Sequence, residues 1–398
     1  MKMSSRTRNL RSPLRDIVAH AKKIEAAGKK MYYFNIGDPN KFDFDTPDHI
    51  KNALTEAVKG KVGHYSASEG DNELKQSIIQ RERKFNGISL ELDNINITHG
   101  ISEAQHELLH TVIEHGTGDE ILLPCPSYPP YIEYTKFAGG VPVEYKMDEE
   151  NDWQADLDHL RHQITDKTKL IVIISPNNPC GSMFSKKTLQ SIINIAGEHN
   201  LPILSDEIYD ELVFGDTEYH GVASLAKDVP VIIFNGFSKA HLMPGWRVGY
   251  TYFYDSQNRL DELKTGFDAI LRQRLSASTP LMKACARAFD DNNHIKEINK
   301  KLKERAEFAY KRLNDIHGII TNKPNGAFYI FPKVEINGSW KNDIEFVLDV
   351  MKETGCVFPY GSGFGSAGNW HFRSVILPPV DVMSEAFDKL DEFMKKKA

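Results

Sequence analysis

The sequence has few cysteines, and they are scattered. Its four cysteines are at positions 125, 180, 285 and 356, and no two of them form a C-x-x-C pair. This spacing argues against both a zinc knuckle and a disulfide scaffold. Because isolated thiols are typical of a reducing compartment, we expect a cytoplasmic protein.

The sequence also lacks long apolar runs and a basic excess. No apolar stretch approaches the roughly 18–20 residues that cross a bilayer, so we expect no membrane partner. The chain has 49 Lys and Arg residues against 55 Asp and Glu residues, which gives a formal charge of −6. Since nucleic-acid-binding proteins need many cations to neutralise phosphates, we expect no nucleic-acid partner.

What is present is a pattern of short apolar runs that alternate with helical periods between about residues 50 and 290. We predict helices that include residues 102–115 and 186–198. The predicted strands are at 95–97, 121–123, 170–174, 202–204, 231–234 and 248–253. This alternation is typical of an α/β protein with a mostly parallel sheet.

The last third of the chain has a different pattern. A long charged helix is predicted at 294–316, followed by a strand at 327–331 and two more helices. An amphipathic helix is predicted near the start, at 13–27. We expect a large domain at 50–290 and a smaller α+β domain formed by 1–49 and 291–398.

Polar motifs follow the predicted strands in five places. The segments are 98–104, 126–131, 175–181, 205–209 and 236–249. Each one has a structural explanation when it is considered alone, such as a capped helix start or a turn stiffened by proline. Because ligands of open parallel sheets bind outside the carboxyl ends of the strands, we expect the five segments to meet at one site.

These segments offer complementary chemical groups. The helix start at Ile101 and Ser102 suits a phosphate, and Tyr128 can stack on a flat ring. Asp206 follows an apolar strand, where a cationic partner would offset the cost of burying its charge. Lys239 is in an apolar, glycine-rich segment, where desolvation favours a neutral, nucleophilic amine. Together these groups fit pyridoxal 5′-phosphate.

The ordered motifs resemble those of the class I/II aminotransferases of fold type I, which depend on this cofactor. The similar segments are N-I-G-D-P at 35–39, N-P-x-G at 178–181, D-x-x-Y at 206–209, S-K at 238–239, G-x-R-x-G at 245–249 and H-F-R at 371–373. The resemblance implies a large domain with a mostly parallel, seven-stranded mixed sheet flanked by helices, and a smaller α+β domain. One departure is Gly236, where many relatives have a hydroxyl side chain.

The resemblance also implies roles for individual residues. Lys239 would form a Schiff base with the cofactor and then act as the general base, and Asp206 would pair with the ring nitrogen. The other implied cofactor contacts are Tyr128 on the ring face, Asn178 and Tyr209 at the ring 3′ oxygen, Ile101, Ser102, Ser238 and Arg247 at the phosphate, and Tyr65 at the phosphate of a neighbouring subunit. Gly37 and Arg373 would bind the substrate carboxylate. The contact of Tyr65 implies a homodimer, and no metal is expected.

Three segments, at 127–131, 235–239 and 371–379, are most similar to alanine aminotransferases of the archaeal and bacterial type. This similarity implies transfer of the amino group of L-alanine to 2-oxoglutarate through a pyridoxamine intermediate, giving pyruvate and L-glutamate. An aspartate or aromatic aminotransferase and a C–S lyase of the same fold remain alternatives, because the motifs that bind the cofactor do not determine which bond breaks. Arg274 is either a contact for a second substrate carboxylate or a structural arginine. The thiol sensitivity of Cys125 and Cys180 stays open.

Overall fold

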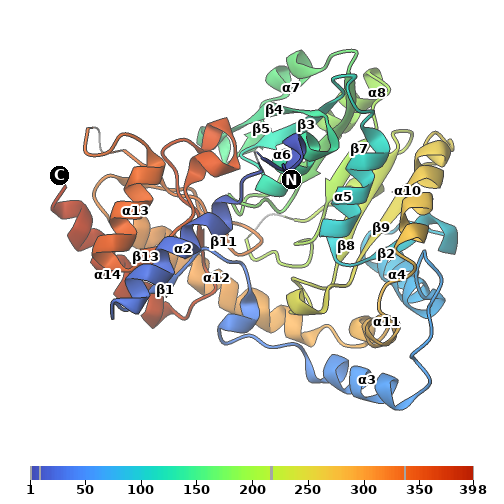
Figure 1. Ribbon diagram of the computed structural model, residues 1–398, viewed down its shortest axis with the longest axis horizontal. Coiled ribbons are helices and arrows are strands. Elements are labelled where there is room, and N and C mark those ends of the chain that lie inside the picture. Colours follow the sequence, from blue (N-terminus) through green and yellow to red (C-terminus); the bar gives the residue numbers. More distant parts are fainter. Residues whose placement is uncertain (1, 9, 216–217, 336–337, 398) are drawn as a thin grey trace.

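The computed structural model describes residues 2–8, 10–215, 218–335 and 338–397. The largest sheet within these residues has eight strands in the order β2-β9-β8-β7-β6-β3-β4-β5 (Figure 1). Its strands are β2 (Ile95–Thr98), β3 (Glu120–Cys125), β4 (Val141–Asp148), β5 (Gln154–Ala155), β6 (Thr168–Ile174), β7 (Ile203–Asp206), β8 (Val231–Gly236) and β9 (Gly249–Tyr254).

The sheet is mixed and mostly parallel, as predicted. Strands β4, β3, β6, β7 and β8 run parallel, whereas β9 is antiparallel to both β8 and β2, and β5 is antiparallel to β4. Seven strands have four residues or more, which agrees with the seven expected, and the eighth is the two-residue β5. All six strands predicted from apolar runs are present, whereas β4 was not predicted.

Both faces of the sheet are buried under helices. In β6, Leu170, Val172 and Ile174 pack on one face and Ile171 and Ile173 on the other. A strand covered on both faces needs apolar residues at every position, which explains its continuous apolar run. Packed on the first face are α5 (Ile101–Val112), α6 (Pro129–Ala138) and α10 (Asp261–Gln273). On the second face are α4 (Asn72–Phe85), α7 (Leu157–Gln163), α8 (Lys186–Glu198), α9 (Val222–Leu225) and α11 (Thr279–Cys285), and α3 (Asp48–Lys59) packs on α11.

A second apolar core lies beside the sheet and combines the two ends of the chain (Figure 1, left). Its helices are α2 (Pro13–Ala26), α12 (Asn293–Asn314), α13 (Asp343–Thr354) and α14 (Val380–Lys395). Three two-stranded sheets complete it, namely β1 (Tyr32–Tyr33) with β13 (Cys356–Val357), β10 (Ile319–Ile320) with β12 (Lys333–Val334), and β11 (Tyr329–Ile330) with β14 (Ser374–Val375). The helices predicted in these regions are confirmed, but the strand expected at 327–331 is only the two-residue β11.

The N-terminal segment adds the short helix α1 (Ser5–Arg8), which contacts α6. Among the described residues, no helix combines the length and the apolar character needed to span a bilayer.

Candidate active site

A pocket of about 460 Å³ opens at the carboxyl ends of the central strands. This volume is in the range of small-molecule sites. Residues of the large sheet and residues of the second apolar core beside it both line the pocket, so the two parts of the structure form it together. Eleven of the twelve predicted site residues are among the residues that line it: Gly37, Ile101, Ser102, Tyr128, Asn178, Asp206, Tyr209, Ser238, Lys239, Arg247 and Arg373.

One end of the pocket is suited to an anion. The first turn of α5, at Ile101 and Ser102, has no capping side chain, so its N–H groups are available to a ligand. The preceding Gly100 has a φ of 70°, and a Cβ on it would overlap the guanidinium of Arg247. Arg247 donates to the carbonyl of Pro244 over 2.9 Å, which directs its side chain along this loop. A helix N-terminus beside an arginine is a favourable phosphate site.

The glycine at position 236 has a local structural reason. Gly236 pairs with Gly249 where β8 ends and β9 begins, and a Cβ on Gly236 would lie 2.8 Å from the Gly249 Cα. Such a contact is too close for real Cβ atoms, so a hydroxyl side chain would require the two strands to separate.

Lys239 lies in the pocket among groups that favour its neutral form. Its Nζ donates to the carbonyl of Gly37 over 2.9 Å. Burial, together with the positive charge of Arg373, lowers the pKa of Lys239 to about 8. At pH 7 about a tenth of this amine is therefore neutral and available as a nucleophile or a base, far more than for an ordinary lysine.

Asp206 ends strand β7 at the base of the same pocket and is only 3% exposed. Burial raises the pKa of Asp206 to about 6, although its carboxylate accepts hydrogen bonds from the Tyr131 hydroxyl (2.8 Å) and the Ile208 N–H (3.2 Å). The carboxylate thus has one hydroxyl partner and is close enough to Lys239 to interact with its charge. A cationic ring nitrogen would stabilise its ionised form.

Arg373 also lines the pocket and is buried, with 1% exposure. Its Nη1 donates to the Asn178 side-chain oxygen over 2.8 Å, and its Nη2 donates to the Asn35 carbonyl over 2.5 Å. The Nε of Arg373 is buried and has no hydrogen-bond partner among the described residues. An arginine whose two Nη atoms are held by hydrogen bonds and whose Nε is still available as a donor suits a carboxylate ligand.

The sequence analysis did not identify Tyr329, which lines the pocket from β11. Its hydroxyl lies 2.8 Å from the Tyr209 hydroxyl, and its ring lies 4.4 Å from the Arg373 guanidinium. The Tyr329 hydroxyl also occupies the space that a side chain on Gly37 would need. At Gly181, in the N-P-x-G segment, a Cβ would overlap the Tyr329 carbonyl oxygen. These glycines are therefore local signals of a close neighbour, although they do not indicate which residue it is.

Tyr65 is the one predicted site residue that does not line the pocket. Its side chain is 77% exposed. The loop around it is nonetheless fixed, because the Thr279 hydroxyl donates to the His64 carbonyl and lies 2.9 Å from the Ser66 hydroxyl.

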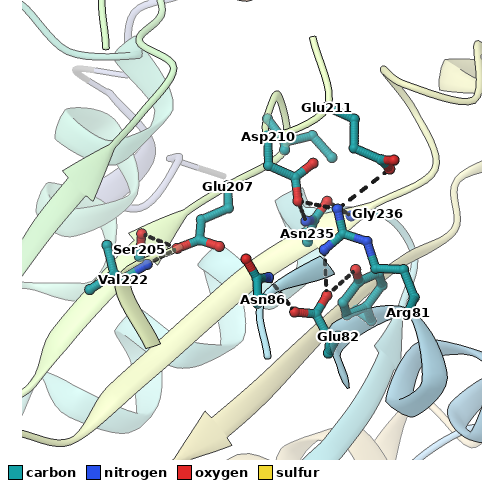
Figure 2. A network of polar contacts seen from close by, with 12 residues as sticks. Arg81, Glu82, Asn86, Ser205, Glu207, Asp210, Glu211, Val222, Asn235 and Gly236 are labelled. Atoms are coloured by element: carbon teal, nitrogen blue, oxygen red, sulfur yellow. Dashed lines mark hydrogen bonds and ion pairs between the residues drawn. The ribbon is translucent and has the colours of Figure 1, made fainter. Parts of the chain in front are cut away.

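A buried ionic network connects α4 with the segment after β7 and with the end of β8 (Figure 2). Arg81 in α4 pairs with Glu82, Asp210 and Glu211. Asp210 also accepts a hydrogen bond from Asn235 over 2.7 Å. Although burial opposes it, the charges of Asp210 and Glu82 raise the pKa of Arg81 well above its usual value. The network links the residue after Tyr209 to Asn235, near the end of β8 and just before the loop of Lys239.

Glu207 lies beside this network and is 1% exposed (Figure 2). Its Oε1 accepts hydrogen bonds from the Ser205 hydroxyl (3.0 Å) and the Val222 N–H (2.9 Å), whereas Oε2 has no partner among the described residues. Burial raises the pKa of Glu207 to about 8, so this carboxyl group is protonated at neutral pH.

Two questions left open by the sequence have structural answers. Arg274 does not line the pocket: its Nη2 donates to the Ile97 carbonyl over 2.5 Å and its Nε lies 3.1 Å from Glu103. Cys125 and Cys180 are buried, and burial raises the pKa of Cys125 to about 12 and that of Cys180 well above its usual value. Both thiols are therefore protonated and weakly nucleophilic at neutral pH.

Comparison with known proteins agrees with this geometry. The family model described as Aminotransferase class I and II matches residues 29–381. The glutamate-pyruvate aminotransferase AlaA of Escherichia coli K12 is 34% identical over 95% of this chain and 94% of that protein. The aspartate aminotransferase of Pyrococcus abyssi is 33% identical over 94% of each chain. The solved structure of an alanine aminotransferase from Pyrococcus furiosus is 47% identical, with a TM-score of 0.97 over 99% of this chain and 100% of that one. The chain belongs to the class I and II aminotransferases.

Proposed function

We propose that this aminotransferase uses pyridoxal 5′-phosphate to transfer the amino group of L-alanine to 2-oxoglutarate, giving pyruvate and L-glutamate. The observation that supports this most directly is the placement of Lys239, Asp206 and Arg373 in one pocket with the open start of α5. An amine, a buried acid, a carboxylate-binding arginine and an anion site are the four groups that this cofactor and an amino acid require.

The pocket residues fit the cofactor in charge and in position. The Ile101 and Ser102 N–H groups, with Ser238 and Arg247, would bind the phosphate, and Asp206 would hold the proton on the ring nitrogen. Tyr128 would stack on the ring, and Asn178 and Tyr209 would donate to its 3′ oxygen. When bound, the cofactor supplies an aldehyde for amines and a ring that accepts the electron pair released at the substrate Cα.

The chain itself positions the substrate and moves its proton. Arg373 would bind the α-carboxylate through its unused donor, beside the backbone of Gly37, whose missing side chain makes room for the Tyr329 hydroxyl. The neutral Nζ of Lys239 would take the proton from the substrate Cα and return it to the cofactor carbon that receives the amino group. Burial of Asp206 in a site closed by Tyr131 keeps water from its carboxylate.

The preference for alanine and glutamate needs a pocket that accepts both a methyl group and a second carboxylate. Leu14, Ile36 and Tyr329 give it apolar surface. Arg15 also lines the pocket and forms no ion pair within the described residues, so it is free to meet the distal carboxylate of glutamate. The named activities of the similar proteins from Escherichia coli and Pyrococcus furiosus support the same substrates.

The test compares initial rates for alanine, aspartate and phenylalanine, each with 2-oxoglutarate. We expect the highest kcat/KM for alanine, and a higher value for aspartate would contradict the proposed substrate. Alanine alone should give one equivalent of pyruvate per site and then stop, whereas a lyase would continue to turn over. Borohydride reduction followed by peptide mapping should label Lys239, and Lys239→Ala should abolish transfer. Arg15→Met should lower kcat/KM for glutamate more than for alanine.

We also propose that the enzyme is a homodimer in which Tyr65 reaches the phosphate site of the neighbouring subunit. A large aromatic side chain that is 77% exposed on a fixed loop supports this arrangement. The domain division at 50–290, with 1–49 and 291–398 as the smaller domain, is part of the same proposal. In sedimentation experiments we expect a dimer, and Tyr65→Phe should weaken retention of the cofactor.

A further inference from the structure

The outer face of α5 has a cluster of metal-ligating side chains that the proposed reaction does not use. His106, Glu107 and His110 each offer one ligand atom, and these atoms all lie within 4.8 Å of one another. The two histidines are four residues apart, so they project from the same face of the helix, one turn apart. All three side chains are partly exposed and therefore accessible to solvent.

Hydrogen bonds determine which nitrogen of each ring is free. The Nδ1 of His110 lies 2.8 Å from the His106 carbonyl oxygen, which can only accept, so this Nδ1 bears the proton. The Nδ1 of His106 lies 3.2 Å from the carboxylate of Glu107 and bears the proton for the same reason. Each neutral ring therefore presents the lone pair of its Nε2.

The two rings are also held in place by packing. Their centroids are 4.3 Å apart. The Tyr134 ring meets His106 edge-on at 5.4 Å, and the Phe137 ring meets His110 edge-on at 5.6 Å. Both aromatic residues belong to α6, so contact between two helices restricts the rotation of the imidazoles.

We propose that His106 and His110 bind one divalent transition-metal ion through their Nε2 atoms, and that Glu107 orients His106. Metal-binding histidines commonly donate their other N–H to a carboxylate or a backbone carbonyl, and here one histidine has each kind of partner. Imidazole ligands select zinc, copper and nickel ions over magnesium and calcium. Water completes the coordination, because the cluster offers two nitrogens.

The ligand atoms of the two histidines need to move only a short distance toward each other to bind one ion. Two ligand atoms on a tetrahedral zinc ion, each about 2.0–2.1 Å from the metal, lie roughly 3.4 Å apart. Before any ion is bound, one ligand atom of each of the three residues lies within 4.8 Å of the others and the two ring centroids are 4.3 Å apart, so an approach of about 1 Å is enough and the packed rings need no large rotation. The site is on the same helix as the proposed phosphate contacts but on a later turn, so this proposal does not depend on the proposed substrate.

The test is calorimetric titration of the metal-free holoenzyme with Ni²⁺ and Zn²⁺ in neutral, non-coordinating buffer. We expect one ion per chain, loss of saturable binding in His106→Ala and in His110→Ala, and about tenfold weaker binding in Glu107→Gln. Bound Cu²⁺ should show coupling to two nitrogens by electron paramagnetic resonance, and to one nitrogen in His110→Ala.

The matched control is His162→Ala in α7. The Nδ1 of His162 lies 2.6 Å from the carbonyl oxygen of Asp158, four residues earlier, as the Nδ1 of His110 lies near the His106 carbonyl. His162 has no second histidine one turn earlier, because that position is Asp158. This variant should bind the metal as the wild type does. His110→Gln replaces His110→Ala if circular dichroism shows that the alanine variant does not fold. Absence of saturable binding, or equal binding by the wild type and both alanine variants, would overturn the proposal.

Discussion

Replacing Arg81 by methionine should destabilise the enzyme strongly, although Arg81 does not line the active-site pocket. The substitution keeps most of the side-chain volume but removes the cation that faces Glu82 and Asp210. These two carboxylates are 1% and 2% exposed at their side chains, so water cannot replace the lost partner. The folded protein must then hold at least one of them protonated.

The expected cost follows from proton linkage. Burial already raises the pKa of Asp210 to about 7, so the additional proton must go to Glu82. Protonating a glutamate at pH 7, when its unfolded pKa is about 4.3, spans about 2.7 pKa units at 1.36 kcal/mol each, or about 4 kcal/mol. This agrees with the 3–5 kcal/mol typical of a broken buried ion pair. At about 2.1 cal/mol/K per residue, the unfolding entropy of the 398 residues is about 0.8 kcal/mol/K. Dividing the loss of stability by this entropy predicts that the midpoint of thermal unfolding falls by roughly 5 °C.

The same reasoning predicts a pH dependence that a simple packing defect would not have. In the variant, the folded state binds a proton that the unfolded state has released above about pH 4, so the loss of stability grows as the pH rises. We expect a loss of about 4 kcal/mol at pH 7 and about 2 kcal/mol at pH 5.5. Urea unfolding of the holoenzyme, followed by circular dichroism at both pH values, measures the difference.

Arg161→Met is the matched control. Arg161 pairs with Glu198 on the surface, where their side chains are 45% and 52% exposed. Removing this pair should cost less than about 1 kcal/mol at either pH. If Arg81→Met lost no more stability than the control, or the same amount at both pH values, the buried network would not have the electrostatic role assigned to it. Arg81→Met/Asp210→Asn should recover part of the loss.

Three further substitutions test the site. Arg373→Lys removes the guanidinium fork that contacts Asn178, so the KM for alanine should rise about ten- to hundredfold. Absorbance of the cofactor should show that its retention is unchanged. If alanine binding and cofactor retention weakened equally, the substrate carboxylate would bind at a different site. Tyr131→Phe removes the hydroxyl bonded to Asp206 and should raise the pKa of Asp206 further above its usual value. Cofactor affinity, measured by equilibrium dialysis, should fall about tenfold at neutral pH and recover at higher pH, and a pH-independent loss would count against this cause. Glu207→Gln mimics the protonated acid, whose folded pKa is about 8. Wild-type stability should fall between about pH 4.3 and pH 8 because only the unfolded carboxyl ionises there, whereas the variant should lack this fall in urea titrations.

The strands that were predicted and the one that was missed differ in burial. Strand β6 is covered on both faces, and its unbroken apolar run was sufficient to identify it. Strand β4 lies near the edge of the sheet, contains Pro142, and mixes exposed and buried positions. Its sequence therefore resembles a polar loop, and only pairing with β3 makes it a strand.

The chemistry of the site could be predicted from the sequence because each of its main residues belongs to a short motif beside a strand: Asp206 ends β7, Lys239 follows β8 and Arg373 precedes β14. Lys239, Asp206 and Arg373 were all predicted, and all three line one pocket. Tyr329 and Arg81 were not predicted, since neither is near a motif in the chain. Their importance depends on contacts made across distant segments, such as the hydroxyl pair of Tyr329 and Tyr209.

The sequence by itself determined the α/β class, the aminotransferase family and the reactive groups, because local periodicity and short motifs specify strands, helix starts and side-chain chemistry. The tertiary structure alone decided which groups tune those residues, namely Tyr131 beside Asp206, Tyr329 beside Tyr209, and Arg81 beside Asp210. The physical reason is that burial and charge set a pKa through neighbours in space, and those neighbours lie 75 to 129 positions away along the chain.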